Sequence, residues 1–242
     1  MYNRRMLPDD FTKPKVSEVV SITSHQLKTP ISIVKAYLEA LLSEDYGKIN
    51  DKQKEYLGDA LENIKRMSML VNHLLDVSRI EERRYELQSQ EFSLKEVTED
   101  IIRDFFSWAQ ASNCQIILKT EKKLPLTISD PLKIRQVIEN IIANAIKYKS
   151  PGQGKIEISI KKENNMLLFS CQDNGIGIPE DDFSKVFSKF YRAEKAVEID
   201  PSGTGLGLYI DKAIIELSGG KIWYEKNPDA GVTFYFTLPI AI

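Results

Sequence analysis

Two stretches of apolar residues with heptad spacing constrain the fold of this chain more than any other feature of its sequence. In each stretch, apolar or small side chains alternate four and three positions apart. This spacing keeps one stripe of a helix facing a partner helix, so two long helices are predicted between residues 15 and 83. The stripe positions are Val20, Ser24, Leu27, Ile31, Val34, Leu38 and Leu41 in the first helix, and Leu57, Ala60, Ile64, Met67, Val71, Leu74 and Ser78 in the second.

The segment between the two stretches, SEDYGKIND at residues 43–51, is polar and contains glycine. It predicts the turn of an antiparallel helical pair, with Asn50 or Asp51 as the cap of the second helix. Because two helices cannot bury all of their apolar side chains against one another, a four-helix bundle made by two chains is expected. This interpretation makes the protein a homodimer, and the alternative is a hairpin that packs on the rest of its own chain. The additional apolar positions are Ile22, Ile33, Leu42, Leu61, Leu70 and Leu75.

From about residue 92 the hydrophobic period changes. A short strand and a helix are predicted in EFSLKEVTEDIIRDFFSWAQ, and a strand in CQIILKT. Asp130 and Pro131 are typical of a helix entry, and two hairpins are predicted in KIEISIKKENNMLLFSCQD and GGKIWYEKNPDAGVTFYFTLP. Strands in antiparallel order with helices between them indicate a two-layer α/β sandwich. The expected fold is therefore α+β and multidomain, with a tail or truncated linker at 1–14, a helical domain at 15–88 and an α/β domain at 89–242.

Composition excludes several classes of function. Lys and Arg total 33 against 35 Asp and Glu, for a net charge of −2, which argues against a nucleic-acid partner. The two cysteines, Cys114 and Cys171, make no disulfide framework and suit a reducing compartment. No uncharged apolar run approaches the roughly 18 residues needed to cross a bilayer. The chain is expected to be a soluble, cytoplasmic core, with membrane contact only through segments absent from it.

Three segments of the second half carry functional residue patterns. GTGLGL, residues 203–208, opens a helical run, where glycines let backbone N–H groups approach phosphates. DNGIGIP, residues 173–179, follows an apolar strand, and Asp173 there is either part of an Asn-Gly turn or a carboxylate that accepts a hydrogen bond from an exocyclic amine. In ENIIANAIKY, residues 139–148, one helix face carries Asn140, Asn144 and Lys147. Such a face suits Mg²⁺ and phosphate oxygens, or it is simply solvated.

The segments occur in the order asparagine helix, DNGIG and GTGLGL, with the aromatic-rich FSKVFSKFYR between the last two. This combination resembles the ATP-binding domain of sensor histidine kinases, within the larger group that includes gyrase, a heat-shock chaperone and mismatch-repair ATPases. The first half resembles the dimerisation and phosphoacceptor domain of the same kinases, and SHQLKTP at residues 24–30 is similar to its phosphoacceptor box. The likeness covers residues 15 to about 240.

The resemblance implies an ATP-dependent protein histidine kinase. ATP bound in the second domain would phosphorylate His25, and the phosphoryl group would then pass to an aspartate of a response-regulator protein. Asp173 would bind adenine, Asn144 would coordinate Mg²⁺ and Lys147 would contact phosphate. The other positions that match the nucleotide-binding residues of the family are Asn140, Tyr148, Gly175, Gly177, Gly203, Thr204, Gly205, Leu206 and Gly207.

The resemblance also implies a mobile lid over ATP at about residues 181–204, with Phe187 and Phe190 as its hydrophobic anchors. Arg192 and Lys189 are candidates for positive charge near the γ-phosphate. Residues 219–220 match the last glycine box of the family, or they are a helix C-cap.

The phosphoacceptor box departs from the family at one position. Many members carry Glu or Asp directly after the histidine, whereas this chain has Gln26. An amide oxygen accepts a hydrogen bond from imidazole but adds no negative charge, so slower autophosphorylation is expected. Thr29 matches the position that orients water for dephosphorylating a regulator, which implies phosphatase activity. Pro30 lacks an N–H and predicts a bend just after His25. The alternative function is a nucleotide-sensing scaffold that binds ATP and a regulator without phosphorylating itself.

Overall fold

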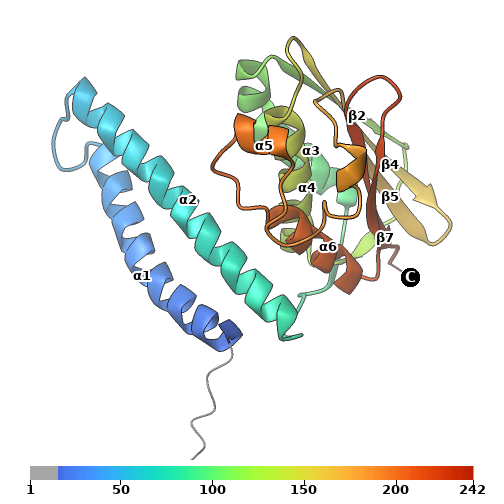
Figure 1. Cartoon of the computed structure of the whole chain (residues 1–242), viewed down its shortest axis with the longest axis horizontal. Coiled ribbons are helices and arrows are strands. Elements are labelled where there is room, and N and C mark those ends of the chain that lie inside the picture. The colour runs from blue at the N-terminus through green and yellow to red at the C-terminus, as the bar shows by residue number, and fades with distance from the viewer. Residues whose placement is uncertain (1–15, 242) are drawn as a thin grey trace, which may run out of the picture. The chain divides into compact units, whose positions relative to one another are not determined.

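The computed structural model describes the backbone of residues 16–241, and their side chains apart from those of residues 16–22 and His25. The predicted tail, residues 1–14, lies outside the described residues. The chain separates into two compact units, with the division after Tyr85 (Figure 1). Within the described part of the chain, no helix has the length and apolar character needed to cross a membrane.

The first unit is an antiparallel helical hairpin. Helix α1 runs over Val16–Leu42 and continues through Pro30, and α2 runs over Asp51–Glu81. Asn50 caps α2, because its side chain accepts from the backbone N–H of Gln53 while the Gln53 side chain accepts from the N–H of Asn50, both at 2.9 Å. This reciprocal pair satisfies two backbone groups that the first helical turn leaves free. Of the two predicted caps, Asn50 is therefore the residue used.

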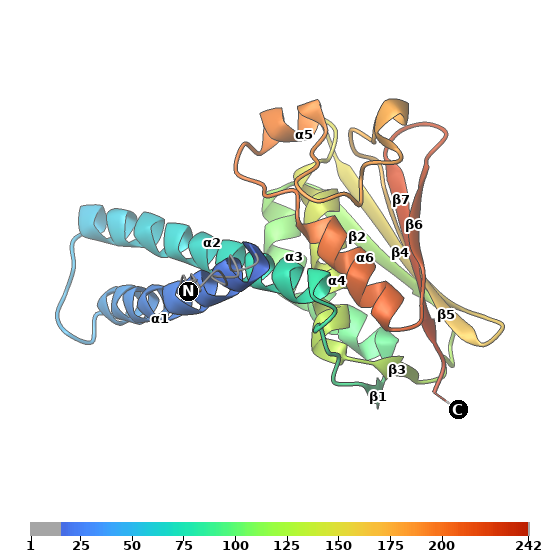
Figure 2. The same cartoon turned by 60° about the horizontal axis from the view of Figure 1, so that its bottom comes forward.

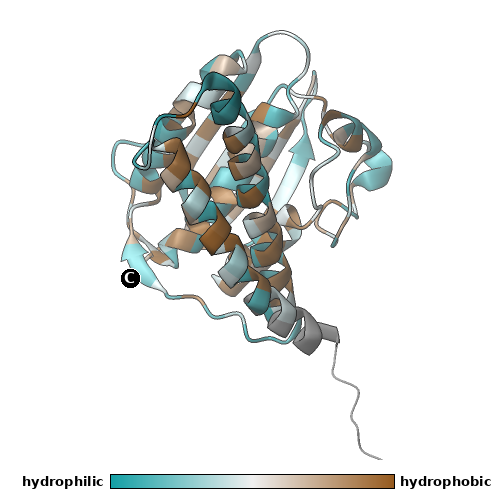
Figure 3. Cartoon of the chain, turned by 90° about the vertical axis from the view of Figure 1, so that its left-hand side faces the viewer, coloured by the Kyte–Doolittle hydropathy of each residue, from teal (hydrophilic) through white to brown (hydrophobic). Residues whose placement is uncertain are grey.

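The hairpin buries much less of its apolar surface than the heptad stripes offer. Its core consists of Ile31, Val71 and Leu75, with Ile64 packed against them, and Leu75 lies outside the predicted stripe. In a pair of helices, each helix covers only one edge of the other's stripe, and the second edge stays uncovered. Hydrophobic residues recur along both helices in Figure 3. Stripe residues that remain 36–47% exposed are Leu27, Val34, Leu41, Met67 and Leu74.

The second unit is built on a mixed sheet. Among the described residues it has five strands in the order β2-β4-β5-β7-β6, and β1 and β3 form a separate two-stranded sheet. The two sheets touch where the Thr127 hydroxyl of β3 donates to the carbonyl of Pro239 at the end of β7, at 2.7 Å. Helices α3, α4 and α6 cover one face of the large sheet (Figure 2), so the predicted two-layer α/β sandwich is confirmed. The bounds are β1 Gln90–Phe92, α3 Leu94–Ala111, β2 Cys114–Thr120, β3 Thr127–Ser129, α4 Pro131–Lys147, β4 Gly154–Glu163, β5 Met166–Asp173, α6 Gly207–Leu217, β6 Ile222–Lys226 and β7 Val232–Pro239.

The prediction that the strands run in antiparallel order is wrong at one edge of the sheet. Strands β2 and β4 pair in parallel, with Ile116 opposite Ile156, whereas β4–β5, β5–β7 and β7–β6 are antiparallel. The chain runs through β3 and α4 before it returns as β4. A helical crossover of this kind brings a strand back in the same direction as the first.

The core of the second unit lies between α4 and the sheet. The helix contributes Ile134, Ile138 and Ile142, each fully buried, and the sheet contributes Phe169 and Phe236, whose rings stack at 4.5 Å. Helix α4 begins at the predicted point, because the Asp130 side chain accepts from the backbone N–H groups of residues 132 and 133 at 3.0 and 3.2 Å. This packing fixes α4 beside the end of β5.

The segment between β5 and α6 contains little regular structure. A 3₁₀ turn covers Glu180–Asp182, and helix α5 covers Glu194–Ile199. At the far end of α6, Gly219 has a φ of 78°. Its N–H donates to Glu216, and the N–H of Gly220 donates to Ile215. This is the Schellman pattern that ends a helix, so the alternative of a C-cap for residues 219–220 is the one the structure supports.

Candidate functional site

Asp173 stands at the end of β5 and is 9% exposed. Its Oδ1 accepts hydrogen bonds from the backbone N–H of Gly175 at 2.8 Å and of Val232 at 3.3 Å. Its backbone carbonyl accepts from the Asn227 side chain at 2.7 Å. In the described part of the chain these bonds leave Oδ2 as the carboxylate oxygen available to a ligand. A lone buried acceptor of this kind matches a hydrogen-bond donor such as an exocyclic amine.

The environment of Asp173 disfavours its charged form. Burial raises the pKa of the carboxyl to about 6, although the two backbone hydrogen bonds partly oppose that shift. A desolvated carboxylate without a cation is costly, and such groups are concentrated at functional sites. Because no described residue forms an ion pair with Asp173, its burial favours a role in binding over a role in stabilising the fold.

Two glycines near Asp173 are required by close backbone approach. A Cβ on Gly175 would overlap the carbonyl oxygen of Tyr148, which caps the end of α4. A Cβ on Gly231, whose φ is 84°, would overlap the carbonyl oxygen of Asp173 itself. The end of β5 is therefore in contact with both the end of α4 and the turn between β6 and β7. This contact explains the requirement for glycine in DNGIG better than an Asn-Gly turn would.

The asparagine face of α4 is held by α6. The amide nitrogen of Asn140 donates to Asp211, a carboxyl that is 1% exposed. A Cβ on Gly207 would lie 2.7 Å from that same amide, so the start of α6 packs directly on Asn140. Burial raises the pKa of Asp211 well above its ordinary value, and the hydrogen bond from Asn140 offsets this only in part. Sequence reasoning missed Asp211, although a single carboxyl inside the apolar run LYIDKAII was a signal.

Asn144 and Lys147 follow Asn140 on the same helix. Asn144 is half-buried, and Lys147 has 36% of its side chain exposed. The Lys147 ammonium forms an ion pair with Asp200 at 2.8 Å. The face predicted to bind phosphate is thus occupied by a carboxylate from the segment between β5 and α6. Asp200 is a second residue that the sequence did not indicate.

The segment GTGLGL forms the turn into α6. Gly205 has a φ of 68°, and a Cβ there would approach the backbone of Phe190 to 2.6 Å. The Thr204 hydroxyl accepts from the N–H of Leu206 at 3.1 Å. Among the described residues no side chain caps the start of α6, which leaves N–H groups of its first turn directed out of the helix. Such groups favour an anion.

The predicted lid is anchored by one of its two proposed aromatic residues. The ring of Phe187 lies 6.0 Å from that of Tyr224 and 6.5 Å from that of Phe234, so this anchor is confirmed. Phe190 is 64% exposed with a φ of 62°, and its prediction as an anchor is wrong. The tight turn onto Gly205 rotates its side chain away from the core.

The guanidinium of Arg192 is already hydrogen-bonded within the lid segment. Its guanidinium donates to the carbonyl oxygens of Gly203 at 3.1 Å and Ala196 at 2.8 Å, and also to that of Asp200. Three carbonyls from one loop satisfy the planar fork of the guanidinium. Arg192 therefore holds the lid segment together and packs on Gly203 of the GTGLGL loop, so its expected place near a γ-phosphate stays a prediction.

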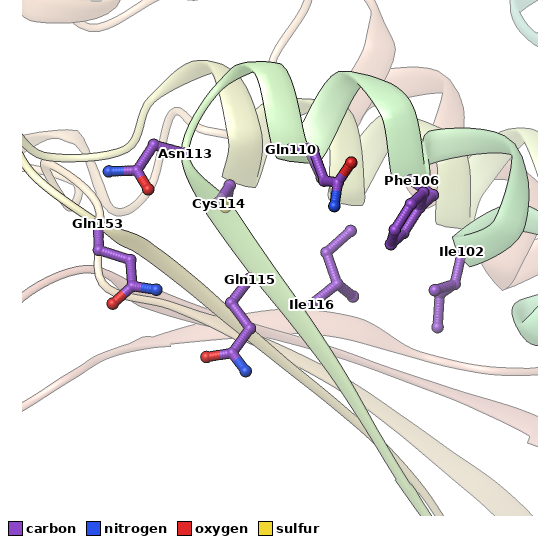
Figure 4. Close-up of a pocket in the computed structure, with 9 residues that line it drawn as sticks. Ile102, Phe106, Gln110, Asn113, Cys114, Gln115, Ile116 and Gln153 are labelled. Atoms are coloured by element: carbon purple, nitrogen blue, oxygen red, sulfur yellow. The ribbon is translucent and has the colours of Figure 1, made fainter.

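A hollow away from this site lies between α3 and the edge strand β2 (Figure 4). It has a volume of about 750 Å³, and Phe106, Gln110 and Ile116 are among the residues that line it. None of its lining residues is charged or belongs to the predicted site. A triphosphate needs cations or helix N-termini, so this hollow does not fit the predicted ligand.

The predicted phosphoacceptor box lies in the first unit, on α1. His25 is within the helix, and its side chain is outside the described residues. Gln26 and Thr29 are exposed, and Ser24 is 3% exposed. The helix therefore buries the serine of the box and presents the glutamine and threonine to solvent.

Comparison with known families matches both units. Residues 15–83 match the His Kinase A (phospho-acceptor) domain, and residues 129–242 match the histidine kinase-, DNA gyrase B- and HSP90-like ATPase. The chain is 37% identical over 224 residues to the sensor histidine kinase WalK of Bacillus subtilis, which covers 92% of this chain and 36% of that protein. It is 30% identical over 224 residues to the circadian input-output histidine kinase CikA of Synechococcus elongatus, covering 92% of this chain and 30% of CikA. The chain thus spans about a third of the length of these relatives.

Solved structures agree with these matches. The catalytic domain of histidine kinase ThkA is 30% identical with a TM-score of 0.56, covering 63% of this chain and 98% of that domain. ThkA in complex with the response regulator protein TrrA is 26% identical with a TM-score of 0.59, covering 93% of this chain and 61% of that one. Full-length ShkA in complex with AMPPNP shares the fold, with a TM-score of 0.75 at 23% identity over 93% of this chain and 46% of ShkA.

Proposed function

Because this chain belongs to the sensor histidine kinases, we propose that it transfers the γ-phosphoryl group of ATP to His25 and then to an aspartate of a response-regulator protein. The observation that carries the proposal is the geometry at the end of β5. A buried carboxylate with one free oxygen, Asp173, lies against the end of the α4 helix that carries Asn144 and Lys147. These groups suit the two ends of ATP.

The adenine end of ATP is assigned to Asp173. Its Oδ2 accepts a hydrogen bond from the exocyclic N6 amine, while Oδ1 keeps its hydrogen bonds from the backbone N–H groups of Gly175 and Val232. Gly177, with a φ of 70°, belongs to the loop beside the base. Tyr148, half-buried at the end of α4, packs along the nucleotide.

The phosphate end of ATP is assigned to residues 203–207, at the α6 end of the segment that joins β5 to α6. Gly203, Gly205 and Gly207, together with Thr204 and Leu206, carry the N–H groups at the start of α6, where an anion is favoured. Lys147 supplies the positive charge. Phosphoryl transfer depends mostly on positioning and charge neutralisation, which these groups provide.

Mg²⁺ is assigned to Asn144, with Asn140 beside it. Within the described residues there is no group of three His, Cys, Asp or Glu side chains that would hold a metal ion. One amide oxygen with phosphates and waters is the ligand set that Mg²⁺ accepts, so the residues present fit this ion. When bound, Mg²⁺ would neutralise charge on the phosphates, and Asn140 is kept in place by its hydrogen bond to Asp211.

At the phosphoacceptor, a ring nitrogen of His25 attacks the γ-phosphorus. A P–N bond forms, the bond from that phosphorus to the bridging oxygen of ADP breaks, and the other ring nitrogen releases its proton to solvent water. The adjacent Gln26 is exposed, and its amide oxygen is of a kind that would accept a hydrogen bond from that N–H. It adds no negative charge, so it stabilises the imidazolium less than a carboxylate would.

The first unit is proposed to form a homodimer. Its exposed stripe, defined by Leu27, Val34, Leu41, Met67 and Leu74, is the surface that a four-helix bundle of two chains would bury. Val34→Glu and Leu41→Glu are expected to halve the mass measured by sedimentation equilibrium. Ser32→Glu is the matched control, because that residue is also exposed on α1 but is polar. A monomeric wild-type protein would contradict the assignment.

A response-regulator receiver domain is the proposed acceptor, supported by the ThkA–TrrA complex. Thr29, exposed one turn after His25 on α1, is proposed to orient water for removing phosphate from the regulator. Thr29→Ala is expected to abolish dephosphorylation of an acyl-phosphate regulator and to leave autophosphorylation of His25 intact. Equal loss of both activities would contradict this role.

A nucleotide-sensing scaffold is the alternative function, and Gln26 is the observation that favours it. Labelling with γ-³²P ATP and Mg²⁺ separates the two. The kinase assignment predicts label that is labile to acid, stable to base, and absent from His25→Ala. A wild-type protein that binds ATP without becoming labelled would support the scaffold, and Gln26→Glu is then the variant that restores the missing carboxylate.

A further inference from the structure

One contact in the second unit joins the proposed phosphate-binding face to the lid. The Lys147 ammonium, near the end of α4, lies 2.8 Å from Oδ2 of Asp200, directly after α5. The two residues are 53 positions apart in sequence. Their side chains are 36% and 14% exposed, so the carboxylate is largely covered.

The carboxylate of Asp200 is fixed at its other oxygen as well. Oδ1 accepts from the backbone N–H of Ser202 at 3.0 Å and from the Ser202 hydroxyl. Burial alone would raise the pKa of Asp200, but the hydrogen bonds from Lys147 and Ser202 bring the pKa down to about 2. Asp200 is therefore an anion at neutral pH.

Arg192 ties Asp200 to the rest of the lid. Its guanidinium donates to the backbone carbonyl of Asp200 and to those of Ala196 and Gly203. Gly203 packs against this guanidinium closely, since a Cβ there would lie 2.9 Å from it. Residues 192–203 thus form one folded piece, which the ion pair between Asp200 and Lys147 attaches to α4.

We propose that Asp200 is paired with Lys147 at the position where a phosphate of the nucleotide binds. The lid carboxylate and the phosphate therefore compete for one ammonium group. This proposal rests on the proposed nucleotide site and deepens it. Both groups offer anionic oxygens to the same donor. An ammonium has three N–H groups but a single positive charge, and Asp200 at 2.8 Å already neutralises it, so the carboxylate repels an incoming phosphate.

The competition has two consequences. Nucleotides that carry a phosphate able to reach Lys147 bind more weakly than the site would otherwise allow, because they must displace Asp200. The displaced Asp200 loses its cation, which releases the folded 192–203 piece from α4. Adenosine does not reach Lys147 and is insensitive to the competition.

The test is a calorimetric titration of the whole chain with ADP and with adenosine. Asp200→Asn keeps an oxygen for Ser202 but loses the charge that holds Lys147. The variant is expected to bind ADP about two- to fivefold more tightly, the range that a partly exposed ion pair commands, and to bind adenosine as wild type does. Glu198→Gln is the matched control, because it removes an exposed lid carboxylate from α5 and is expected to leave both affinities unchanged.

A double-mutant cycle locates the effect. In a Lys147→Met background, Asp200→Asn is expected to leave ADP affinity unchanged, since the ammonium for which the two anions compete is gone. The proposal is overturned if Asp200→Asn weakens or does not change ADP binding, if it changes adenosine binding equally, or if its gain persists without Lys147. A wild-type chain that binds neither ligand overturns the proposed nucleotide site together with this proposal, whereas wild-type binding without a gain in Asp200→Asn overturns this proposal alone.

Discussion

Replacing Asp173 with asparagine is expected to stabilise the second unit while it removes nucleotide binding. The raised pKa of Asp173, about 6 against 3.8 for an exposed aspartate, means that the folded state holds the proton more tightly than the unfolded state does. The stability contributed by this carboxyl is therefore fully present below pH 3.8 and is lost as the pH rises through about 6. At 1.36 kcal/mol for each pKa unit, the loss is about 3 kcal/mol.

Asparagine has the same shape and avoids that loss. Its oxygen still accepts from the N–H groups of Gly175 and Val232. The free energy of unfolding of Asp173→Asn should exceed that of wild type by an amount that grows with pH, about 1.4 kcal/mol of the growth falling between pH 5 and pH 8. Binding should be lost, because the new amide group takes the place of Oδ2 and presents N–H groups to the adenine amine.

Urea unfolding followed by tryptophan fluorescence measures this difference in the second unit alone. Both tryptophans, Trp108 and Trp223, lie after Tyr85, where the two units divide. Asp229→Asn, at an exposed carboxyl in the turn between β6 and β7, controls for the loss of one charge. A difference between Asp173→Asn and wild type that does not change with pH, or a wild type that is the more stable protein at pH 8, would refute the reasoning.

Three further outcomes are expected. Gln26→Glu should autophosphorylate faster than wild type, within the roughly 10²- to 10⁴-fold that a general base provides, and rapid-quench rates that are equal would exclude this effect. Gly231→Ala should destabilise the second unit by roughly 2–5 kcal/mol, because alanine is strained in the left-handed conformation and its Cβ overlaps Asp173. Gly152→Ala is the control in the same urea assay. Gly152 has a φ of 101° but open space around it, so its substitution should show the strain alone. Asn50→Ala should cost the hairpin about 1 kcal/mol, seen as earlier loss of helical circular dichroism on heating, and an unchanged melt would show that the cap is dispensable.

Much of the fold could be predicted because it depends on neighbours in sequence. The strand at Cys114–Thr120 and the cap at Asp130 have the predicted limits, since alternation and capping are read over a few residues. The parallel pairing of β2 with β4 was missed, because strand direction depends on where the crossover through α4 places the returning chain.

The candidate site was predictable where glycine and charge form a local motif, and not where distant segments meet. Asp200 looks like an ordinary surface carboxyl in sequence, yet it is paired with Lys147. Asp211 is marked only by the apolar run around it, and that run does not reveal its partner Asn140. Arg192 resembles a phosphate ligand by composition, but the loop folds its own carbonyls around it. Phe190 failed as an anchor for the same reason, since its backbone conformation is set by the approach of Gly205.

The place of β7 in the sheet has a consequence for the order of events during synthesis. Asp173 is positioned by Asn227, Gly231 and Val232, and β7 lies between β5 and β6 in the sheet. A nascent chain that has emerged from the ribosome only as far as β5 therefore has the aspartate without the backbone that aims it. A nucleotide that binds through Asp173 therefore cannot stabilise this unit until the chain has emerged as far as Val232.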